Sequence, residues 1–294
     1  TTLRRALAKS ANAATVRISQ QVGPGRVAET ARRFGIRSPL GTAPSIALGA
    51  YEVTPIELVT AYAPFANGGV RVEPRLVTRV EAPDGAVLWE APPAAPRTVM
   101  DPRDAFLLTS MLRSVVDEGT GRAVREAGVR DAVAGKTGTS NGGTDVWFVG
   151  YTPTIVAGFW FGHDTPRPMG AASGGRLAAP AWAEFFSAGW RERDATWRAP
   201  AGLVSRRIDA SNGLLANEYC PWTRDEWFRT GEAPQRSCDW HTEPVYEPEW
   251  PVDSTAAEPP PPVEEAVKEA GKRARRWFER IFGGGGENAR PAPR

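Results

Sequence analysis

The sequence predicts an α/β (α+β) fold, in which an antiparallel sheet is flanked by helices and a further part of the chain is all-helical. Three observations indicate this. Residues 1–70 carry helical patterning, apolar residues recur at helical spacing over 101–118, and three short apolar segments follow at 132–139, 145–151 and 154–161. Because the connections between these segments are short, we expect antiparallel neighbouring strands.

Local signals set the ends of the other elements. Thr54-Pro55-Ile56-Glu57 combines a hydroxyl N-cap, a proline at the first helical position and a glutamate at the third, and it predicts a helix start. Asn67-Gly68-Gly69 ends that helix, and Pro64 is expected to kink or shorten its last turn. Asp101-Pro102-Arg103-Asp104 predicts the start of the next helix. Between these two helices, apolar and polar residues alternate on both sides of Pro83-Asp84-Gly85, which predicts a hairpin.

A helix over 182–190 is expected to pack back onto the three strands. Composition changes after it, and the basic, amphipathic segment near the C-terminus predicts either a helix on an anionic membrane surface or a solvated helix. We expect a main domain, a small Cys- and Trp-containing extension, a proline-rich linker, an amphipathic helix and a flexible tail, over 1–200, 201–250, 251–262, 263–282 and 283–294.

The composition excludes several classes of protein. Hydrophobic residues make up 41%, charged residues 24%, and the net charge is +2, which is typical of a globular chain and not of a disordered, collagenous or nucleic-acid-binding one. The longest apolar stretch, 146–161, is too short to span a bilayer. The chain opens on Thr1 inside a helical pattern rather than on Met, so we expect a fragment of a longer protein.

The two cysteines, Cys220 and Cys238, lie close together in the extension. A disulfide between them would contribute roughly 3 kcal/mol and would imply an oxidising compartment. Two free, buried thiols are the alternative. A zinc site fits less well, because only His241 lies near and there is no second cysteine pair. No metal site is therefore predicted.

The most specific motif is Lys136-Thr137-Gly138-Thr139, at the end of an apolar strand. Lys136 is one of only four lysines among 36 basic residues, and its compact charge attracts a carboxylate and favours proton loss from a nearby hydroxyl. Gly138 lets a ligand's backbone lie against the strand edge, while Thr137 and Thr139 offer hydroxyl donors. The alternative is a polar turn with an exposed lysine. A phosphate-binding loop is excluded, because Arg130 stands where that motif requires glycine.

A second, weaker motif is Ser10-Ala11-Asn12, between the helical patterns 3–9 and 13–22. Taken alone, a serine or asparagine at such a point is typical of a helix N-cap.

Together these motifs resemble the transpeptidase domain of class A, bifunctional penicillin-binding proteins. The resemblance extends from about Thr2 to His241, with Ser10 and Asn12 as the Ser-x-Asn motif and Lys136 to Thr139 as Lys-Thr-Gly-Thr. Further matching segments are 3–12, 47–49, 53–58, 65–69, 119–121, 134–139 and 145–151.

The resemblance implies a penicillin-binding, β-lactamase-like fold and a D,D-transpeptidase that cross-links peptidoglycan stem peptides through a serine acyl-enzyme. It implies that Ser10 relays protons with Lys136, that Asn12 binds the substrate amide, and that Thr137 and Thr139 hold its terminal carboxylate. It implies stem peptides, β-lactams and the cell-wall synthesis machinery as partners, and no cofactor. It also implies an extracytoplasmic location, with an N-terminal anchor and a glycosyltransferase domain outside this sequence.

The sequence departs from the family in one respect. The nucleophile is the serine of a Ser-x-x-Lys motif, but Ala6, Val133, Glu265 and Glu269 stand three residues before the four lysines. We therefore expect an N-terminally truncated domain whose nucleophile lies upstream and which is inactive alone. The alternative is a non-catalytic cell-wall binding or scaffolding protein that retains the fold.

Overall fold

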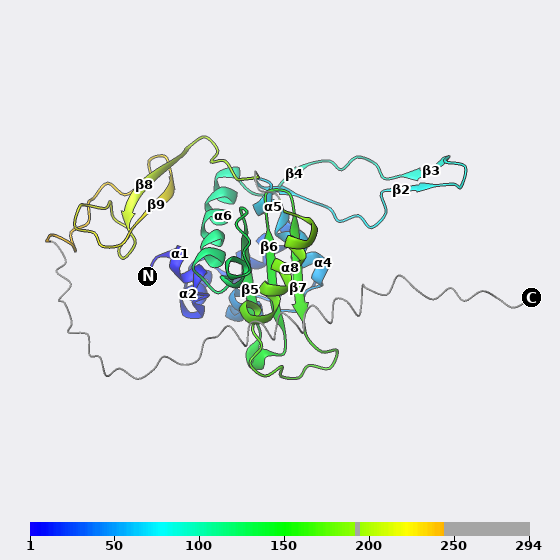
Figure 1. The fold of residues 1–294 in the computed structure, drawn as a ribbon, viewed down its shortest axis with the longest axis horizontal. Coiled ribbons are helices and arrows are strands. Elements are labelled where there is room, and N and C mark those ends of the chain that lie inside the picture. The colour runs from blue at the N-terminus through cyan, green and yellow to red at the C-terminus, as the bar shows by residue number, and fades with distance from the viewer. Residues whose placement is uncertain (192–194, 244–294) are drawn as a thin grey trace, which may run out of the picture. The chain divides into compact units, whose positions relative to one another are not determined.

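The computed structural model describes residues 1–191 and 195–243 (Figure 1). The linker, amphipathic helix and tail predicted over 251–294 lie outside the described residues. Within the described part, no helix combines the length and the apolar character needed to cross a bilayer. The described chain combines helices with antiparallel strands, which confirms the predicted mixed fold class.

The centre of the fold is a three-stranded antiparallel sheet made of β5 (Ala134–Thr139), β6 (Val146–Tyr151) and β7 (Val156–Phe161). These are the three strands that the sequence predicts. The order is β5-β6-β7, so β5 occupies an edge. Lys136 pairs with Val149, which in turn pairs with Gly158. Because directly opposed residues share a face, these three residues mark one face of the sheet.

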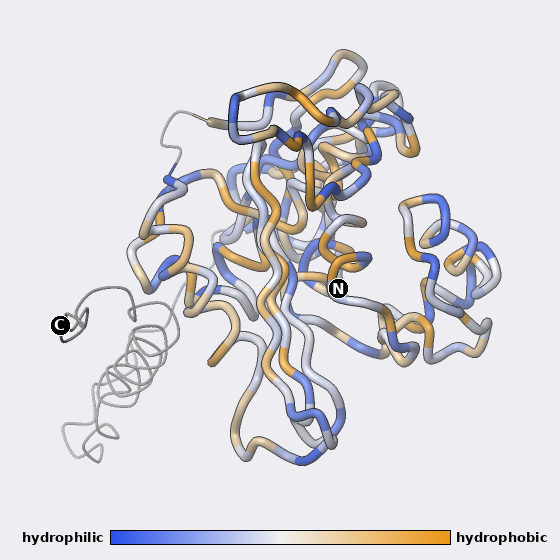
Figure 2. The backbone as a smooth tube through the Cα atoms, turned by 90° about the vertical axis from the view of Figure 1, so that its right-hand side faces the viewer, coloured by the Kyte–Doolittle hydropathy of each residue, from blue (hydrophilic) through white to orange (hydrophobic). Residues whose placement is uncertain are grey.

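The other face of the sheet is covered by α8 (Ala179–Gly189), as predicted. Trp182 of this helix packs edge-on against Phe148, with ring centroids 5.8 Å apart, and stacks on Phe186. A side chain at Gly150 would lie 2.6 Å from the Trp182 ring, so the glycine permits this close approach. Hydrophobic residues follow the strands and hydrophilic ones gather in the loops at their lower end (Figure 2). Within residues 1–191 and 195–243, the hydrophobic core that includes Trp182 and Phe148 consists of ten buried residues: Val116, Val124, Val129, Val133, Phe148, Ala178, Ala179, Trp182, Ala183 and Phe186.

Among the residues that the structure describes, the longest helix is α6 (Pro102–Asp117), which lies beside β5 (Figure 1). The Asp101 side chain caps its first turn by accepting from the Arg103 N–H at 2.8 Å, as the start signal predicts. The hydroxyl of Thr109, on α6, lies 3.1 Å from that of Tyr151 on β6, and this buried contact joins the helix to the sheet.

The helical part of the chain covers the face of the sheet that carries Lys136. A side chain at Gly158 would meet Val59 of α4 at 2.3 Å, which places this helix against β7. Thr54 caps α4, and the helix ends before Pro64, so that α5 forms separately, as expected from the proline. The elements are α1 (Leu3–Ala8), α2 (Asn12–Val22), α3 (Pro24–Phe34), η1 (Pro44–Leu48), α4 (Pro55–Ala61) and α5 (Ala63–Ala66).

The remaining elements of the main region are short. The predicted hairpin around Pro83-Asp84-Gly85 is formed by β2 (Arg79–Glu81) and β3 (Val87–Glu90), and every residue of both strands is exposed. The others are β1 (Val70–Arg71), β4 (Arg97–Thr98), α7 (Ala123–Glu126), η2 (Asn141–Gly143) and η3 (Gly174–Ala178).

The extension is a second antiparallel hairpin, formed by β8 (Leu203–Asp209) and β9 (Thr223–Arg229). It is attached to the main region by a few specific contacts. Glu226 of β9 accepts from Nε of Arg4, in α1, at 2.6 Å. The rings of Trp227 and Phe106 meet edge to face, with centroids 5.3 Å apart.

Candidate active site

The site begins at the turn between α1 and α2, where Ser10 has a φ of 53°. In the part of the chain that the structure describes, it is the one non-glycine residue in the left-handed region. The turn is held by backbone bonds from the Ser10 N–H to the Leu7 carbonyl (3.1 Å) and from the Ala11 N–H to the Ala6 carbonyl (2.8 Å). Such strained conformations cost of order 1–3 kcal/mol and cluster at functional sites.

Lys136 extends from the edge strand to this turn. Its Nζ donates to Ser10 Oγ at 2.9 Å and to the carbonyl oxygen of Thr137 at 3.0 Å. The structure therefore brings together two predicted site residues that are 126 positions apart. Burial lowers the pKa of the Lys136 ammonium to about 8, because the charged form is partly removed from water.

Asn12 is exposed and lies in the first turn of α2. The N-cap position of this helix is Ala11, and no side chain caps it. The simple N-cap interpretation of Ser10-Ala11-Asn12 is therefore wrong: neither polar side chain has that role here.

The two threonines of the motif lie on the face of the sheet opposite Lys136, because successive strand residues alternate. Thr137 Oγ1 lies 2.6 Å from Oγ1 of Thr120, in the loop after α6. Thr139 is exposed, and its Oγ1 accepts from the Gly174 N–H at 3.1 Å. Both hydroxyls thus have protein partners that hold them at the strand edge.

Thr120 was not among the predicted site residues. Its N–H donates to the carbonyl of Ala8 at 3.1 Å, so the loop that contacts Thr137 also holds the end of α1. A side chain at Gly119 would lie 2.3 Å from the same carbonyl oxygen, which explains a glycine at this close approach. In the sequence, the resemblance of residues 119–121 to the family pointed to this loop, but it did not assign a role to the Thr120 hydroxyl.

The strand edge is also tightly packed around Gly138. A side chain there would lie 3.2 Å from Cβ of Trp147, and a side chain at Gly174 would lie 2.7 Å from the Gly138 carbonyl oxygen. Gly174 therefore lets η3 approach β5, and Gly138 leaves room for the Trp147 side chain on the neighbouring strand.

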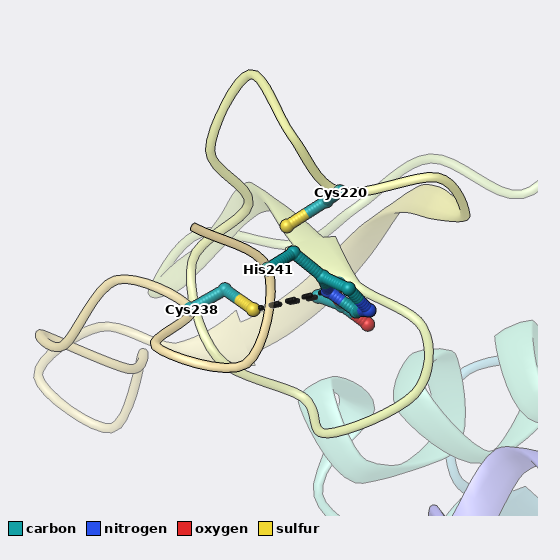
Figure 3. Close-up of side chains that lie close together, drawn as sticks. Cys220, Cys238 and His241 are labelled. Atoms are coloured by element: carbon teal, nitrogen blue, oxygen red, sulfur yellow. Dashed lines mark hydrogen bonds and ion pairs between the residues drawn. The ribbon is translucent and has the colours of Figure 1, made fainter. Parts of the chain in front are cut away.

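The cysteines of the extension are free thiols in the structure. They lie close together with His241, as Figure 3 shows, and with Asp209 at the end of β8. Asp209 was missed by the sequence argument, which counted only His241 beside the cysteine pair.

A helix-flanked antiparallel sheet, with a Lys-Thr-Gly-Thr edge strand that contacts a Ser-x-Asn turn, defines the transpeptidase class that the resemblance implied. Residues 1–187 match the penicillin binding protein transpeptidase domain, and residues 199–243 match the C-terminal domain of penicillin-binding protein 1A. The chain therefore belongs to the penicillin-binding protein transpeptidase family.

The chain is similar in sequence to penicillin-binding proteins 1A of several bacteria. That of Neisseria gonorrhoeae is 37% identical over 212 residues, which cover 69% of this chain and 26% of the relative. That of Pseudomonas aeruginosa is 32% identical over 284 residues, covering 79% and 34%. The chain thus spans about a quarter to a third of the length of these relatives.

Solved structures share the fold. Penicillin-binding protein 1A from Haemophilus influenzae superposes with a TM-score of 0.72 at 24% identity, covering 81% of this chain and 41% of that one. PonA1 from Mycobacterium tuberculosis gives 0.60 at 23% identity, with coverage of 68% and 59%, and a second PonA1 structure holds penicillin V.

Proposed function

We propose that this chain supplies one wall of the active site of a serine D,D-transpeptidase, which cross-links peptidoglycan stem peptides through an acyl-enzyme. The observation that carries the proposal is the 2.9 Å contact between Lys136 Nζ and Ser10 Oγ. A lysine half-buried at an edge strand and bonded to a hydroxyl in a strained turn is an arrangement suited to proton transfer.

The direction of the hydrogen bond between Lys136 and Ser10 indicates how a proton could be transferred. Because Lys136 donates to Ser10 Oγ, the hydroxyl proton of Ser10 is free to point toward a substrate. Ser10 can then give that proton to the leaving amine of the D-Ala–D-Ala bond, while Lys136 returns one to Ser10 Oγ. A pKa of about 8 leaves Lys136 mostly protonated at neutral pH but able to lose its proton at small cost.

Substrate binding is assigned to the edge of β5. A stem peptide, or a β-lactam in its place, would lie along this edge with its carboxylate at the hydroxyls of Thr137 and Thr139. Gly138 presents no side chain to the ligand's backbone, and the Thr139 N–H would be one donor to the developing oxyanion. Asn12 would bind the substrate amide.

The nucleophile is expected in a Ser-x-x-Lys segment, which the printed sequence does not contain. We infer that it lies upstream of Thr1 in a longer, extracytoplasmic protein that also carries a glycosyltransferase domain. The small share of the relatives' length that the chain covers supports this.

The test uses the longer protein and a labelled penicillin. Lys136→Ala is expected to abolish acylation, whereas Lys268→Ala, a lysine outside both family matches, serves as the matched control and leaves it unchanged. Normal acylation of the Lys136→Ala protein would remove this lysine from the mechanism. The 294-residue chain alone is expected to form no adduct, and a stoichiometric mass shift would show that the nucleophile is misplaced.

The absence of Ser-x-x-Lys from the printed sequence favours one second candidate, a non-catalytic protein that binds cell-wall peptides at the same edge of β5. Reading the codons upstream of Thr1 separates the two. A Ser-x-x-Lys within a few tens of residues supports the enzyme, and a start codon at Thr1 supports the binding protein.

A further inference from the structure

Four side chains of the extension converge on one point. Asp209 ends β8, Cys220 precedes β9, and Cys238 and His241 follow it. One potential ligand atom from each lies within 4.8 Å of all the others. Cys238 Sγ is 3.4 Å from His241 Nδ1, a contact that is drawn as a dashed line in Figure 3. Asp209 Oδ2 lies 3.4 Å from Cys238 Sγ and 2.6 Å from His241 Nδ1.

These separations suit a tetrahedral metal. Zinc–ligand distances of about 2.3 Å to sulfur and about 2.0–2.2 Å to nitrogen or oxygen place neighbouring ligand atoms roughly 3.3–3.8 Å apart. The two 3.4 Å contacts of Cys238 already lie in that range. Of these three contacts, the one between His241 and Asp209 has to open, by less than about 1 Å, and Cys220 Sγ already lies within 4.8 Å of the other three ligand atoms.

The surrounding donors fit a negatively charged ligand set. Asn212 Nδ2 donates to Cys238 Sγ at 3.2 Å, and the Asn217 N–H donates to Cys220 Sγ at 3.4 Å. The Ser211 N–H holds Asp209 Oδ1 at 2.6 Å, so Oδ2 is left to face the cluster. N–H donors to sulfur stabilise thiolates, and outer contacts of this kind orient metal ligands.

The extension otherwise lacks an interior. Of its residues 201–243, all of which the structure describes, only Ile208, Asp209 and Cys238 are buried. A two-stranded hairpin is marginally stable in water, and segments of this size are usually held by disulfides, metals or a partner. A fully buried carboxylate is also costly unless it is paired or binds a cation.

We propose that Asp209, Cys220, Cys238 and His241 bind one Zn²⁺ ion in a closed site that holds the extension together. Thiolate and imidazole ligands favour zinc over Mg²⁺ or Ca²⁺. All four positions are filled by protein, which is typical of a structural site rather than a catalytic one. On binding, both thiols lose their protons and His241 is neutral, so two thiolates, one carboxylate and Zn²⁺ leave a net charge of −1.

The competing state is a disulfide between Cys220 and Cys238. It would consume both sulfur ligands and leave Asp209 and His241 as an isolated pair. Zinc and disulfide are mutually exclusive, because a metal ligand must be a thiolate. One measurement of metal content and thiol oxidation therefore decides between them.

The primary experiment uses the unaltered 294-residue chain, purified with a mild reductant and without chelator. We expect one equivalent of zinc by elemental mass spectrometry. We also expect two thiols that resist alkylation until the metal is removed. Reloading the stripped chain with Co²⁺ is expected to give tetrahedral d–d bands and a thiolate charge-transfer band. Reduced chain that binds neither metal, or chain that forms the disulfide when zinc is present, would overturn the proposal.

Variants locate the site. Asn212→Ala leaves the ligands in place and is expected to weaken zinc binding about 10–100-fold, the usual cost of losing an outer contact. Cys238→Ser is expected to weaken it further. The chain has two histidines, so His163→Ala is the matched control for His241→Ala: the first retains one equivalent of zinc and the second loses it. Zinc that survives both Cys238→Ser and His241→Ala would place the metal elsewhere and refute the site.

Discussion

The sheet region and the extension are built on opposite physical principles. Around β6, a cluster of fully buried hydrophobic side chains encloses Phe148 and Trp182, and its stability comes from apolar burial. In the extension, the buried centre is a carboxylate and a thiol beside Ile208. We therefore expect the first region to tolerate changes at its surface and the second to depend on a few polar contacts.

The comparison shows where small changes have large effects. In the sheet region the critical residues are large and apolar. In the extension they are Glu226, which is bonded to Arg4, and the cluster around Asp209. Substitutions in each region therefore test whether the sheet region depends on apolar burial and the extension on polar contacts.

The largest effect is expected from Trp182→Ala. Trp182 is fully buried, stacks on Phe186, and donates from Nε1 to the Ala157 carbonyl at 3.2 Å. Its loss is expected to lower the free energy of unfolding by about 3–5 kcal/mol, measured by urea denaturation. Trp222→Ala, in the extension and 68% exposed, is the matched change and is expected to cost less than about 0.5 kcal/mol. Equal losses of unfolding free energy in the two variants would mean that apolar burial does not account for the difference between the two regions.

The next largest effect is expected at the ion pair between Arg4 and Glu226, one of several that join the two regions. The side chains of Arg4 and Glu226 are only 8% and 16% exposed, and Arg4 also donates to the Ser110 hydroxyl at 2.8 Å. Glu226→Gln leaves the guanidinium without its counter-charge, at an expected cost of about 2–3 kcal/mol in the same unfolding measurement.

Its control is Glu118→Gln, which breaks a more exposed ion pair between the regions, with Arg224 at 2.7 Å. The Glu118 side chain is 48% exposed, so we expect a cost of about 0.5 kcal/mol. A Glu226→Gln protein as stable as this control would show that the extension is held by its other contacts, which include the Arg229–Asp104 ion pair and the packing of Trp227 on Phe106.

The candidate active site differs from both regions, because its buried Lys136 is expected to lower the stability of the fold. Lys136→Met is expected to raise the free energy of unfolding at pH 7 by about 1–2 kcal/mol. The removed charge is disfavoured by burial, and only part of that gain is lost with its hydrogen bonds. Between pH 8 and about 10.5 the unfolded chain binds more protons than the folded one. The advantage of the variant is therefore expected to shrink across that window.

The measurement is urea denaturation at several pH values, with Lys9→Met as control. Lys9 is exposed and donates to the Glu118 carbonyl at 2.7 Å, so its removal is expected to give no gain. A pH-independent difference between Lys136→Met and the unaltered chain would contradict the lowered pKa of Lys136.

Elements with a local signal could be predicted from the sequence. The three strands were bounded by turn residues, and Pro64 marked the break between α4 and α5. The contact between Ser10 and Lys136 spans 126 positions and was expected only through the family resemblance. Nothing in the spacing linked Thr120 to Thr137, or Asp209 to the cysteines, because a residue at a strand end reaches its partners only once the hairpin is formed.

The smallest effect is expected from Asp239→Asn, between Cys238 and His241. Asp239 pairs with Arg236 at 2.8 Å, but their side chains are 54% and 76% exposed, and such pairs contribute less than about 0.5 kcal/mol. If the buried cluster holds this loop, the substitution leaves both the unfolding free energy and the zinc content unchanged. A loss above about 1 kcal/mol would mean that the loop depends on its surface pair. The extension would then be stabilised by its surface contacts, and the buried cluster around Asp209 would not distinguish it from other hairpins.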